Sequence, residues 1–325
     1  MPGRIVFMGS DPIALPVLEL LARSSEEVVA VYTQPDRAVG RGQRIQPNPI
    51  KRWACDQGIE IRQPPHLTED ERNSLEGLGA DLVLVMAYGH LLDQDWLDTP
   101  RGGVFNLHTS LLPRYRGASP IQATLLEGDT EGGVTLMRLV LALDAGPLVD
   151  CEKVGIGPNE TAGSLEEKLS RASVPLVARN LDAVLRGEAR LEPQDKTRVS
   201  YTRKLHKSDG VLDFSESAVI LAGRINGLFP WPGVAVQVIG VPIRCALADH
   251  RPDTVDVSAG TVLEPDGVGL RIATGSGVLR IRRLQRPGGR ILDGPEFLRG
   301  FPVVPGTVLE SHPMPRLVAN EVLRG

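Results

Sequence analysis

The sequence predicts an α/β protein with a doubly wound, mostly parallel, Rossmann-like sheet, followed by a small C-terminal β-barrel. Short, β-branched apolar runs at residues 5–8, 28–32, 82–86, 104–107 and 134–141 are typical of strands covered on both faces. Helical patterns separate these runs over the first 190 residues, and such alternation favours a parallel sheet. Beyond residue 209, short strands with frequent Gly and Pro indicate a small barrel.

The helices of the first part are predicted from their places between and after the apolar runs and, for the last of them, from apolar spacing. They are expected at residues 13–22, 49–57, 68–75, 120–126 and 161–186. The last of these carries Leu165, Leu169 and Leu181 at helical spacing, and we expect Pro175 to break or kink it.

The helical and strand patterns stop between residues 192 and 209, where Lys and Arg cluster, so we interpret this segment as an exposed basic linker. Strands of the barrel are expected at residues 234–239, 243–247, 260–263, 270–273 and 278–284. The predicted organisation is therefore a catalytic domain at 1–191, a linker at 192–209 and a β-domain at 210–325.

Composition is that of a globular protein, since 42% of the 325 residues are apolar and 23% are charged. No apolar run approaches the roughly 20 residues that span a bilayer, so no membrane association is expected. The chain starts with a strand pattern and not with a signal peptide, and it has three widely separated Cys, at positions 55, 151 and 245. We expect a cytoplasmic monomer without a disulfide framework or a metal site.

Charge is unevenly divided along the chain. Residues 196–325 carry 17 Lys and Arg against 12 Asp and Glu, a formal charge of +5, whereas residues 1–195 carry 19 against 28, or −9. A basic C-terminal part suggests contact with a polyanion, although scattered surface Arg would give the same count.

The most informative stretch is residues 103–117, where an apolar strand ends in Asn106 and His108 before a loop rich in Pro and Gly. Residues two apart on a strand face the same side, and open α/β sheets bind ligands at the carboxyl ends of strands. Each residue alone is more often structural. Together, an uncharged donor and a proton carrier suit a reaction in which a carbonyl oxygen gains charge while a proton moves.

This stretch, with Ser-Leu-Leu-Pro at residues 110–113 and Leu-Asp-Ala-Gly at residues 143–146, resembles the formyltransferase family that uses 10-formyltetrahydrofolate. The resemblance runs nearly end to end, through residues 4–9, 33–42, 87–89, 229–233 and 296–300. It implies that Asn106, His108 and Asp144 form the catalytic triad and that the C-terminal β-barrel is OB-like. Ala145 departs from the family, which puts any role of that side chain in doubt.

The resemblance also implies a folate site beside the triad. One wall is the turn of Ser110, Leu111, Leu112 and Pro113, whose rigid backbone would face the pterin. The adjacent wall is the end of another central strand, made of Met86, Ala87, Tyr88 and Gly89. Gly9 is not followed by the second and third glycines of a dinucleotide motif, so no nicotinamide cofactor is expected.

The segment at residues 36–47 is a charged, Gly-containing loop with no apolar anchor. Such loops are usually solvated surface, but the resemblance implies an insertion that contacts the acceptor end of tRNA through Arg37, Arg41 and Arg44. Arg41 matches the key basic residue of that insertion.

Further tRNA contacts are expected from Lys204 and Lys207 in the linker and from Arg280, Arg282 and Arg283 in the barrel. Arg280 and Arg282 alternate with apolar residues and so share one face of a strand. A solvated sheet face is the alternative reading of any one of them.

The expected activity is therefore transfer of a formyl group from 10-formyltetrahydrofolate to the amino group of methionine on initiator tRNA, with no metal. Two alternatives stay open. The first is a formyltransferase acting on a small molecule, or a hydrolase of the same donor. The second is a tRNA-binding protein without activity, which the joint presence of Asn106, His108 and Asp144 disfavours.

Overall fold

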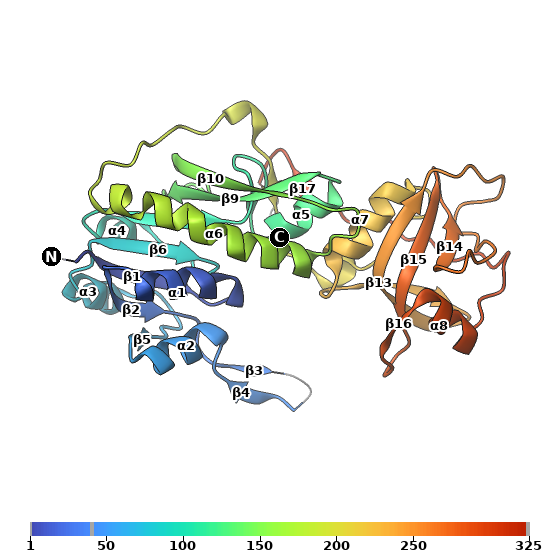
Figure 1. Ribbon diagram of the computed structural model, residues 1–325, viewed down its shortest axis with the longest axis horizontal. Helices are drawn as coiled ribbons and strands as arrows, with labels where there is room; N and C mark the ends of the chain where they lie inside the picture. The colour runs from blue at the N-terminus through green and yellow to red at the C-terminus, as the bar shows by residue number, and fades with distance from the viewer. Residues whose placement is uncertain (1, 40–41, 323–325) are drawn as a thin grey trace. The chain divides into compact units, whose positions relative to one another are not determined.

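A computed structural model describes residues 2–39 and 42–322 (Figure 1). The described residues fall into two compact units. The first lies within Met1–Arg116, Gly133–Val154 and Glu166–Val199, and the second within Gly117–Gly132, Gly155–Leu165 and Ser200–Gly325. No helix in these described parts is both long enough and apolar enough to cross a membrane.

The first unit is built on a seven-stranded sheet with the order β10-β9-β7-β6-β1-β2-β5. Its strands are β1 (Arg4–Gly9), β2 (Glu27–Tyr32), β5 (Glu60–Arg62), β6 (Leu82–Met86), β7 (Val104–His108), β9 (Glu131–Arg138) and β10 (Leu148–Gly155). The pairs from β5 through β2, β1 and β6 to β7 are parallel, and β9 is antiparallel to β7. The predicted Rossmann-like, mostly parallel sheet is confirmed.

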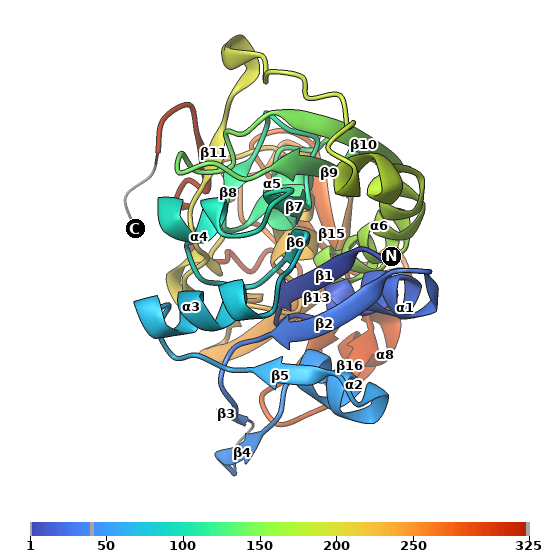
Figure 2. The ribbon, with the colours of Figure 1, turned by 90° about the vertical axis from the view of Figure 1, so that its left-hand side faces the viewer.

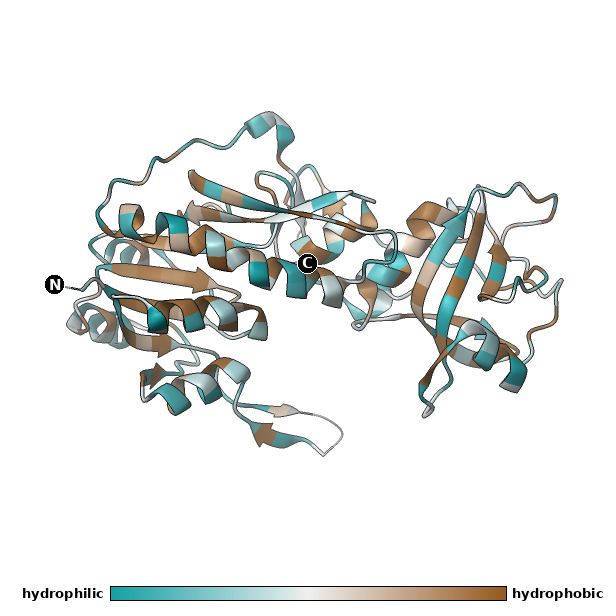
Figure 3. Cartoon of the chain, viewed as in Figure 1, coloured by the Kyte–Doolittle hydropathy of each residue, from teal (hydrophilic) through white to brown (hydrophobic). Residues whose placement is uncertain are grey.

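Helices cover both faces of this sheet, as Figure 2 shows. On one side lie α1 (Leu15–Arg23), α2 (Pro49–Gln57) and α6 (Ala162–Leu185); on the other lie α3 (Glu69–Gly77) and α4 (Gln94–Asp98). The strands β1 and β6 are apolar along most of their length (Figure 3), because both of their faces are buried. Leu75 of α3 and Trp96 of α4 pack with Val6 and Val83 in the core on one face.

Local signals fix several helix ends. Asn48 precedes Pro49 and accepts a hydrogen bond from the Lys51 backbone N–H at the start of α2, a standard N-cap. Thr68 caps α3 in the same way. The helix α6 runs through Pro175 without the predicted break, since its buried Leu176 and Val177 hold it in the core.

The sheet has a topological switch point at β1, which lies between β2 and β6. Ligands of open α/β sheets bind where the chain departs to opposite sides in this way. The residue after β1 and the residue after β6 meet there, because the backbone N–H of Ser10 donates to the carbonyl of Ala87 at 3.1 Å.

The charged loop predicted after β2 is a hairpin of β3 (Arg37–Val39) and β4 (Arg44–Gln46), paired antiparallel. Arg41 lies outside the described residues.

The second unit holds an antiparallel sheet with the order β12-β13-β15-β14, and β16 pairs with β15. Its strands are β12 (Val234–Val238), β13 (Val241–Arg251), β14 (Leu270–Ala273), β15 (Val278–Gln285) and β16 (Ile291–Asp293). Apolar and polar residues alternate along β13 and β15 (Figure 3), so one face is buried and the other is polar. This confirms the predicted antiparallel β-domain.

Helices complete the core of this unit. They are α5 (Pro120–Leu126), α7 (Ala218–Leu228) and α8 (Gly294–Gly300). In α7, an added Cβ at Gly223 would lie 2.7 Å from the carbonyl oxygen of Leu125 at the end of α5, so the absence of a side chain permits this close approach. The remaining short elements are η1 (Pro12–Ala14), β8 (Arg116–Gly117), η2 (Lys196–Arg198), β11 (Tyr201–Thr202), η3 (Lys207–Asp209) and β17 (Val318–Ala319).

Candidate active site

Asn106 and His108 lie on the same side of β7, at the carboxyl end of a central strand. The side-chain amide of Asn106 is partly exposed and forms no hydrogen bond to any described residue. Its two N–H groups are thus available to a ligand. His108, by contrast, is only 6% exposed.

The imidazole of His108 is hydrogen-bonded at one nitrogen and faces a carboxylate at the other. Its Nε2 lies 3.0 Å from the backbone carbonyl oxygen of Tyr115, and because a carbonyl only accepts, Nε2 carries the proton. This leaves Nδ1 as the reactive nitrogen. It faces Asp144, whose Oδ2 is 3.7 Å away, and the two side chains are 7% and 12% exposed. The structure therefore brings the predicted His and Asp together.

Asp144 reaches this position by a route that the strand pattern does not predict. Since β9 is antiparallel to β7, Arg138 at its end lies opposite Phe105, at the far end of β7 from His108. The loop at residues 139–147 folds back along β7. Asp144 has a φ of 46° within that loop, a conformation that Asp and Asn adopt more readily than most residues.

Two features hold the loop in place. An added Cβ at Gly146 would lie 1.8 Å from the carbonyl oxygen of Arg138, so only glycine fits there. The side-chain Nε2 of Gln194 donates to the carbonyl oxygens of Asp144 and Gly146, both at 2.8 Å. Gln194 lies in the predicted exposed linker but is buried.

Gln194 is itself fixed by Arg116. The Nη2 of Arg116 donates to its Oε1 at 2.8 Å, and the Nε does so at 3.2 Å. Sequence reasoning missed both residues, because their role depends on a contact between segments 78 positions apart. Arg116 stands at the end of a loop rich in Pro and Gly, where the sequence gives no local signal for this pairing.

The turn predicted as the first wall of the folate site is rigid. The Oγ of Ser110 donates to the Arg114 carbonyl at 2.7 Å. Thr135 on β9 donates to the Ser110 carbonyl at 2.6 Å and accepts from the Leu112 backbone N–H at 3.2 Å. Ser110, Leu112 and Pro113 are buried, whereas Leu111 is partly exposed.

The second predicted wall divides into two kinds of residue. The side chains of Met86 and Tyr88 are buried, at 0% and 2% exposure, so they belong to the core beneath the wall. Ala87 and Gly89 are exposed and have φ values of 51° and 87°. The surface available to a ligand at this wall is therefore mainly Ala87, Gly89 and the backbone.

The basic residues predicted to contact tRNA differ in their exposure and in their ion pairs. Arg37, Arg44, Lys204 and Lys207 are exposed. Neither Lys204 nor Lys207 forms an ion pair with a described residue.

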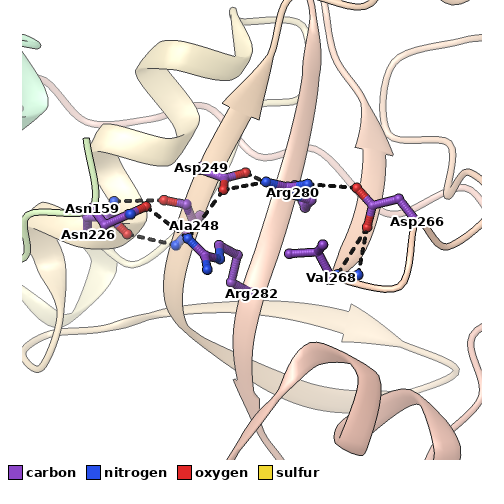
Figure 4. Close-up of polar contacts among 9 residues, drawn as sticks. Asn159, Asn226, Ala248, Asp249, Asp266, Val268, Arg280 and Arg282 are labelled. Carbon is purple, nitrogen blue, oxygen red and sulfur yellow. Dashed lines mark hydrogen bonds and ion pairs between the residues drawn. The ribbon is translucent and has the colours of Figure 1, made fainter.

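Arg280 is placed differently from these. It is 5% exposed, and Figure 4 shows its guanidinium between two carboxylates. The Nε and Nη2 donate to Asp249 at 2.8 and 2.7 Å, and the Nη1 donates to Asp266 at 2.8 Å. The hydrogen bond to Asp249 is the main cause that raises the pKa of Arg280. This Arg is engaged within the sheet and has no free face for a phosphate.

The neighbouring arginines keep some exposure. Arg282 donates to the side-chain oxygen of Asn159 at 3.2 Å (Figure 4) and its side chain is 35% exposed. Arg283 is 3.5 Å from Asp293 and its side chain is 50% exposed.

No group of three or more His, Cys, Asp or Glu side chains in the described parts of the chain is arranged to hold a metal ion. The available chemistry at the end of β7 is that of an amide donor, an imidazole and a carboxylate on a Rossmann-like sheet, which fits transfer of an acyl-type group.

Comparison with known proteins agrees with this class. A family model described as formyl transferase matches residues 4–181, and the model for the formyl transferase C-terminal domain matches residues 204–302. The chain belongs to the formyl transferase family and is an enzyme.

Its curated relatives make the assignment narrower. A protein of Halorhodospira halophila named methionyl-tRNA formyltransferase is 41% identical over 94% of this chain and 99% of its own length. One of the same name from Ectopseudomonas mendocina is 42% identical over 89% and 92%. Among solved structures, an N-formyltransferase from Helicobacter canadensis, in complex with folinic acid and dTDP-3-aminofucose, has a TM-score of 0.67 and 17% identity, and the match covers 88% of this chain and 100% of the other. That likeness shows a shared fold.

Proposed function

We propose that this enzyme transfers the formyl group of 10-formyltetrahydrofolate to the α-amino group of methionyl initiator tRNA. The names and coverage of its curated relatives support the acceptor. The observation that carries the chemistry is the uncommitted amide of Asn106 beside the paired His108 and Asp144, at the carboxyl end of a central strand.

In the proposed reaction, the neutral methionyl nitrogen attacks the formyl carbon and forms a C–N bond. The formyl oxygen becomes an oxyanion, and the bond from carbon to N10 of the folate then breaks. One proton leaves the attacking nitrogen and one proton is delivered to N10, so that tetrahydrofolate and formylmethionyl-tRNA result. The step as written requires no metal ion and no covalent enzyme intermediate.

Asn106 is proposed to donate an N–H to the oxyanion. Because its amide has no competing partner among the described residues, it does not have to break a bond within the protein to do so. Losing one such donor typically costs about 3 kcal/mol of barrier.

His108 and Asp144 are proposed to handle the proton. The bond from Nε2 to the Tyr115 carbonyl fixes the imidazole so that Nδ1 is the proton acceptor. A proton taken up at Nδ1 creates an imidazolium next to the Asp144 carboxylate at 3.7 Å, and the low exposure of both groups strengthens that attraction. The imidazolium can then assist the oxyanion or return the proton to N10.

The donor is proposed to bind between the two walls beside the triad, formed by residues 110–113 and 86–89. Ala87 and Gly89 supply the exposed backbone of the second wall. The first wall contributes a turn already fixed by Ser110 and Thr135, so little conformational entropy is lost on binding.

The proposed tRNA-binding residues are Arg37, Arg41 and Arg44 in the segment after β2, Lys204 and Lys207, and Arg282 and Arg283 on β15. Arg280 is left out because two carboxylates already neutralise it. We propose that the enzyme acts in the cytoplasm, where charged initiator tRNA and folates are both present. We also propose that it is a monomer, which sedimentation of the purified protein tests.

The decisive experiment is formylation with 10-formyltetrahydrofolate and four acceptors: methionyl initiator tRNA, methionyl elongator tRNA, free methionine and water alone. Rapid formylation of the initiator tRNA with little of the others supports the proposal. Equal use of free methionine would indicate a small-molecule enzyme, and turnover with water alone would indicate a hydrolase. Binding of tRNA without turnover would indicate a protein that has lost its donor site.

A further inference from the structure

The base of the β3–β4 hairpin is held by a cluster of polar side chains at the carboxyl ends of β1 and β2. Asp36 precedes β3, and its carboxylate accepts from the Lys51 ammonium at 2.7 Å and from the Gln63 amide at 2.8 Å. These hydrogen bonds, with that of Lys51 the stronger influence, lower the pKa of Asp36. The hairpin thus leaves the sheet from a fixed starting point.

Gln34 is the centre of this cluster, because every polar group it owns is bonded. Its backbone N–H donates to the Ser10 hydroxyl at 3.0 Å. Its backbone carbonyl accepts from Asn48 at 3.1 Å and from Gln63 at 2.8 Å. A residue bonded at its backbone N–H and C=O and at both polar atoms of its side chain is held in one orientation.

The side chain of Gln34 spans two functional segments. Its Oε1 accepts from the Arg37 guanidinium at 2.7 Å, at the first residue of β3, and its Nε2 donates to the Tyr88 carbonyl at 3.3 Å. Only this orientation of the amide satisfies both contacts, since an Arg only donates and a carbonyl only accepts.

A second bond strengthens the link at the Tyr88 end. The Ser10 hydroxyl that accepts from Gln34 also donates to the Tyr88 carbonyl at 3.1 Å, and the Ser10 backbone N–H bonds Ala87. The turn at residues 87–89 is therefore tied, through Gln34 and Ser10, to the base of the hairpin.

We propose that Gln34 is a positioning residue that couples donor binding at the turn of residues 87–89 to acceptor binding by the β3–β4 hairpin. The inference rests on the proposed function, in which the turn faces the folate and the hairpin contacts tRNA. A folate that orders the turn fixes the Tyr88 carbonyl, and through Gln34 it fixes Arg37 and the direction of the hairpin. Each substrate then binds more tightly in the presence of the other, because coupling is reciprocal.

The test measures the dissociation constant of tetrahydrofolate by titration calorimetry, with and without saturating methionyl initiator tRNA. In the unaltered enzyme we expect the tRNA to tighten tetrahydrofolate binding about fivefold or more. Gln34→Glu keeps an acceptor for Arg37 and the backbone bond to Ser10 but loses the donor to Tyr88, and it should bring the ratio of the two dissociation constants well below that of the unaltered enzyme. Hydrogen exchange in β3 and β4 should slow on adding tetrahydrofolate to the unaltered enzyme, and less so in Gln34→Glu.

Two further variants make the result specific. Gln46→Glu makes the same charge change on β4 at an exposed side chain that forms no bond to a described residue, so it should keep the coupling ratio even if tRNA affinity falls. Arg37→Met cuts the other end of the bridge and should abolish the coupling while leaving the contact from Gln34 to Tyr88.

The outcomes separate the inference from the function beneath it. A ratio near one in the unaltered enzyme, with both ligands shown to bind, overturns the coupling and leaves the proposed activity standing. Retention of the full ratio in a folded Gln34→Glu enzyme also overturns it. Failure of tetrahydrofolate to bind the unaltered enzyme would remove the proposed function and the coupling together.

Discussion

The side-chain amide of Gln194 donates a 2.8 Å hydrogen bond to the backbone carbonyl of Asp144, a residue 50 positions earlier in the chain. The same amide nitrogen bonds Gly146, so one side chain spans the loop that presents the Asp144 carboxylate to His108. The position of the carboxylate thus depends on a residue that does not itself belong to the triad.

Replacing Asp144 with Asn should lower kcat by about 10²- to 10⁴-fold while tRNA affinity stays within about twofold. Asn tolerates the positive φ of this position, so the change removes the charge without straining the loop. Steady-state formylation and tRNA binding measured on the same preparation provide the check. Asp70→Asn, at an exposed helix position without an ion pair, is the matched control and should retain full activity. Loss of tRNA affinity in Asp144→Asn, with kcat preserved, would contradict the assigned role.

Gly146→Ala should displace the catalytic loop, because the new Cβ would collide with the backbone oxygen of Arg138. We expect a fall in kcat of at least about tenfold together with a lower melting temperature. Gly163→Ala is the comparison, since nothing lies within 4 Å of a Cβ there. It lies in α6, and the change should stabilise the protein by up to about 1 kcal/mol. Equal melting temperatures and activities for the two variants would show that the loop adjusts freely.

Removing the charge of Arg280 should mainly lower the stability of the protein, whereas removing the charge of Lys207 should mainly weaken tRNA binding. Arg280→Met removes the hydrogen-bond donor of Asp249 and Asp266, whose side chains are 16% and 26% exposed, and should cost about 1–3 kcal/mol of unfolding free energy. Lys207→Met should leave the stability nearly unchanged but weaken tRNA binding and reduce its salt dependence by about one ion. Urea unfolding and tRNA titrations at several salt concentrations measure both effects. If Arg280→Met were as stable as the unaltered protein and its tRNA binding depended less on salt, Arg280 would be a tRNA contact after all.

Stability should fall in acid partly through Asp209, which is 2% exposed. Burial alone raises the pKa of this carboxyl, but the hydrogen bonds from Arg203 and the His206 backbone outweigh it and lower the pKa below its usual value. A lowered pKa in the folded state stabilises the protein above the unfolded pKa of about 3.9, and this stabilisation is lost as the pH falls through the folded value.

The unfolding free energy of the unaltered protein should therefore drop between about pH 5 and pH 2, and that of Asp209→Asn should drop less steeply over the same range. Urea unfolding at each pH provides the measurement. Parallel curves for the two proteins would mean that the pair with Arg203 contributes nothing to the acid response.

Elements with strong local signals could be predicted closely. The bounds of α2 and α5 match the prediction, because Asn48 and two prolines at first helical positions mark the starts. The edge strand β10 was missed, since its exposed charged residues interrupt the apolar pattern. So was α7, whose apolar residues do not gather on one side and whose two glycines pack against α5.

In the candidate site, too, some features could be predicted from local sequence and others could not. Asn106 and His108 could be predicted to share a face because they are two residues apart on one strand. The path of Asp144 could not, because it depends on the antiparallel direction of β9 and on Gln194. The burial of Arg280 was hidden for a similar reason, as Asp249 and Asp266 come from other parts of the unit and only folding brings them together.

The bonds from Gln194 to the catalytic loop determine how short an active fragment of this protein can be. A truncated protein that stopped at residue 181, where the first family match ends, would contain all three triad residues and the folate turn. It would nevertheless lack the carboxamide that anchors the catalytic loop and accepts from Arg116. Any fragment intended to work on its own has to extend past this single glutamine.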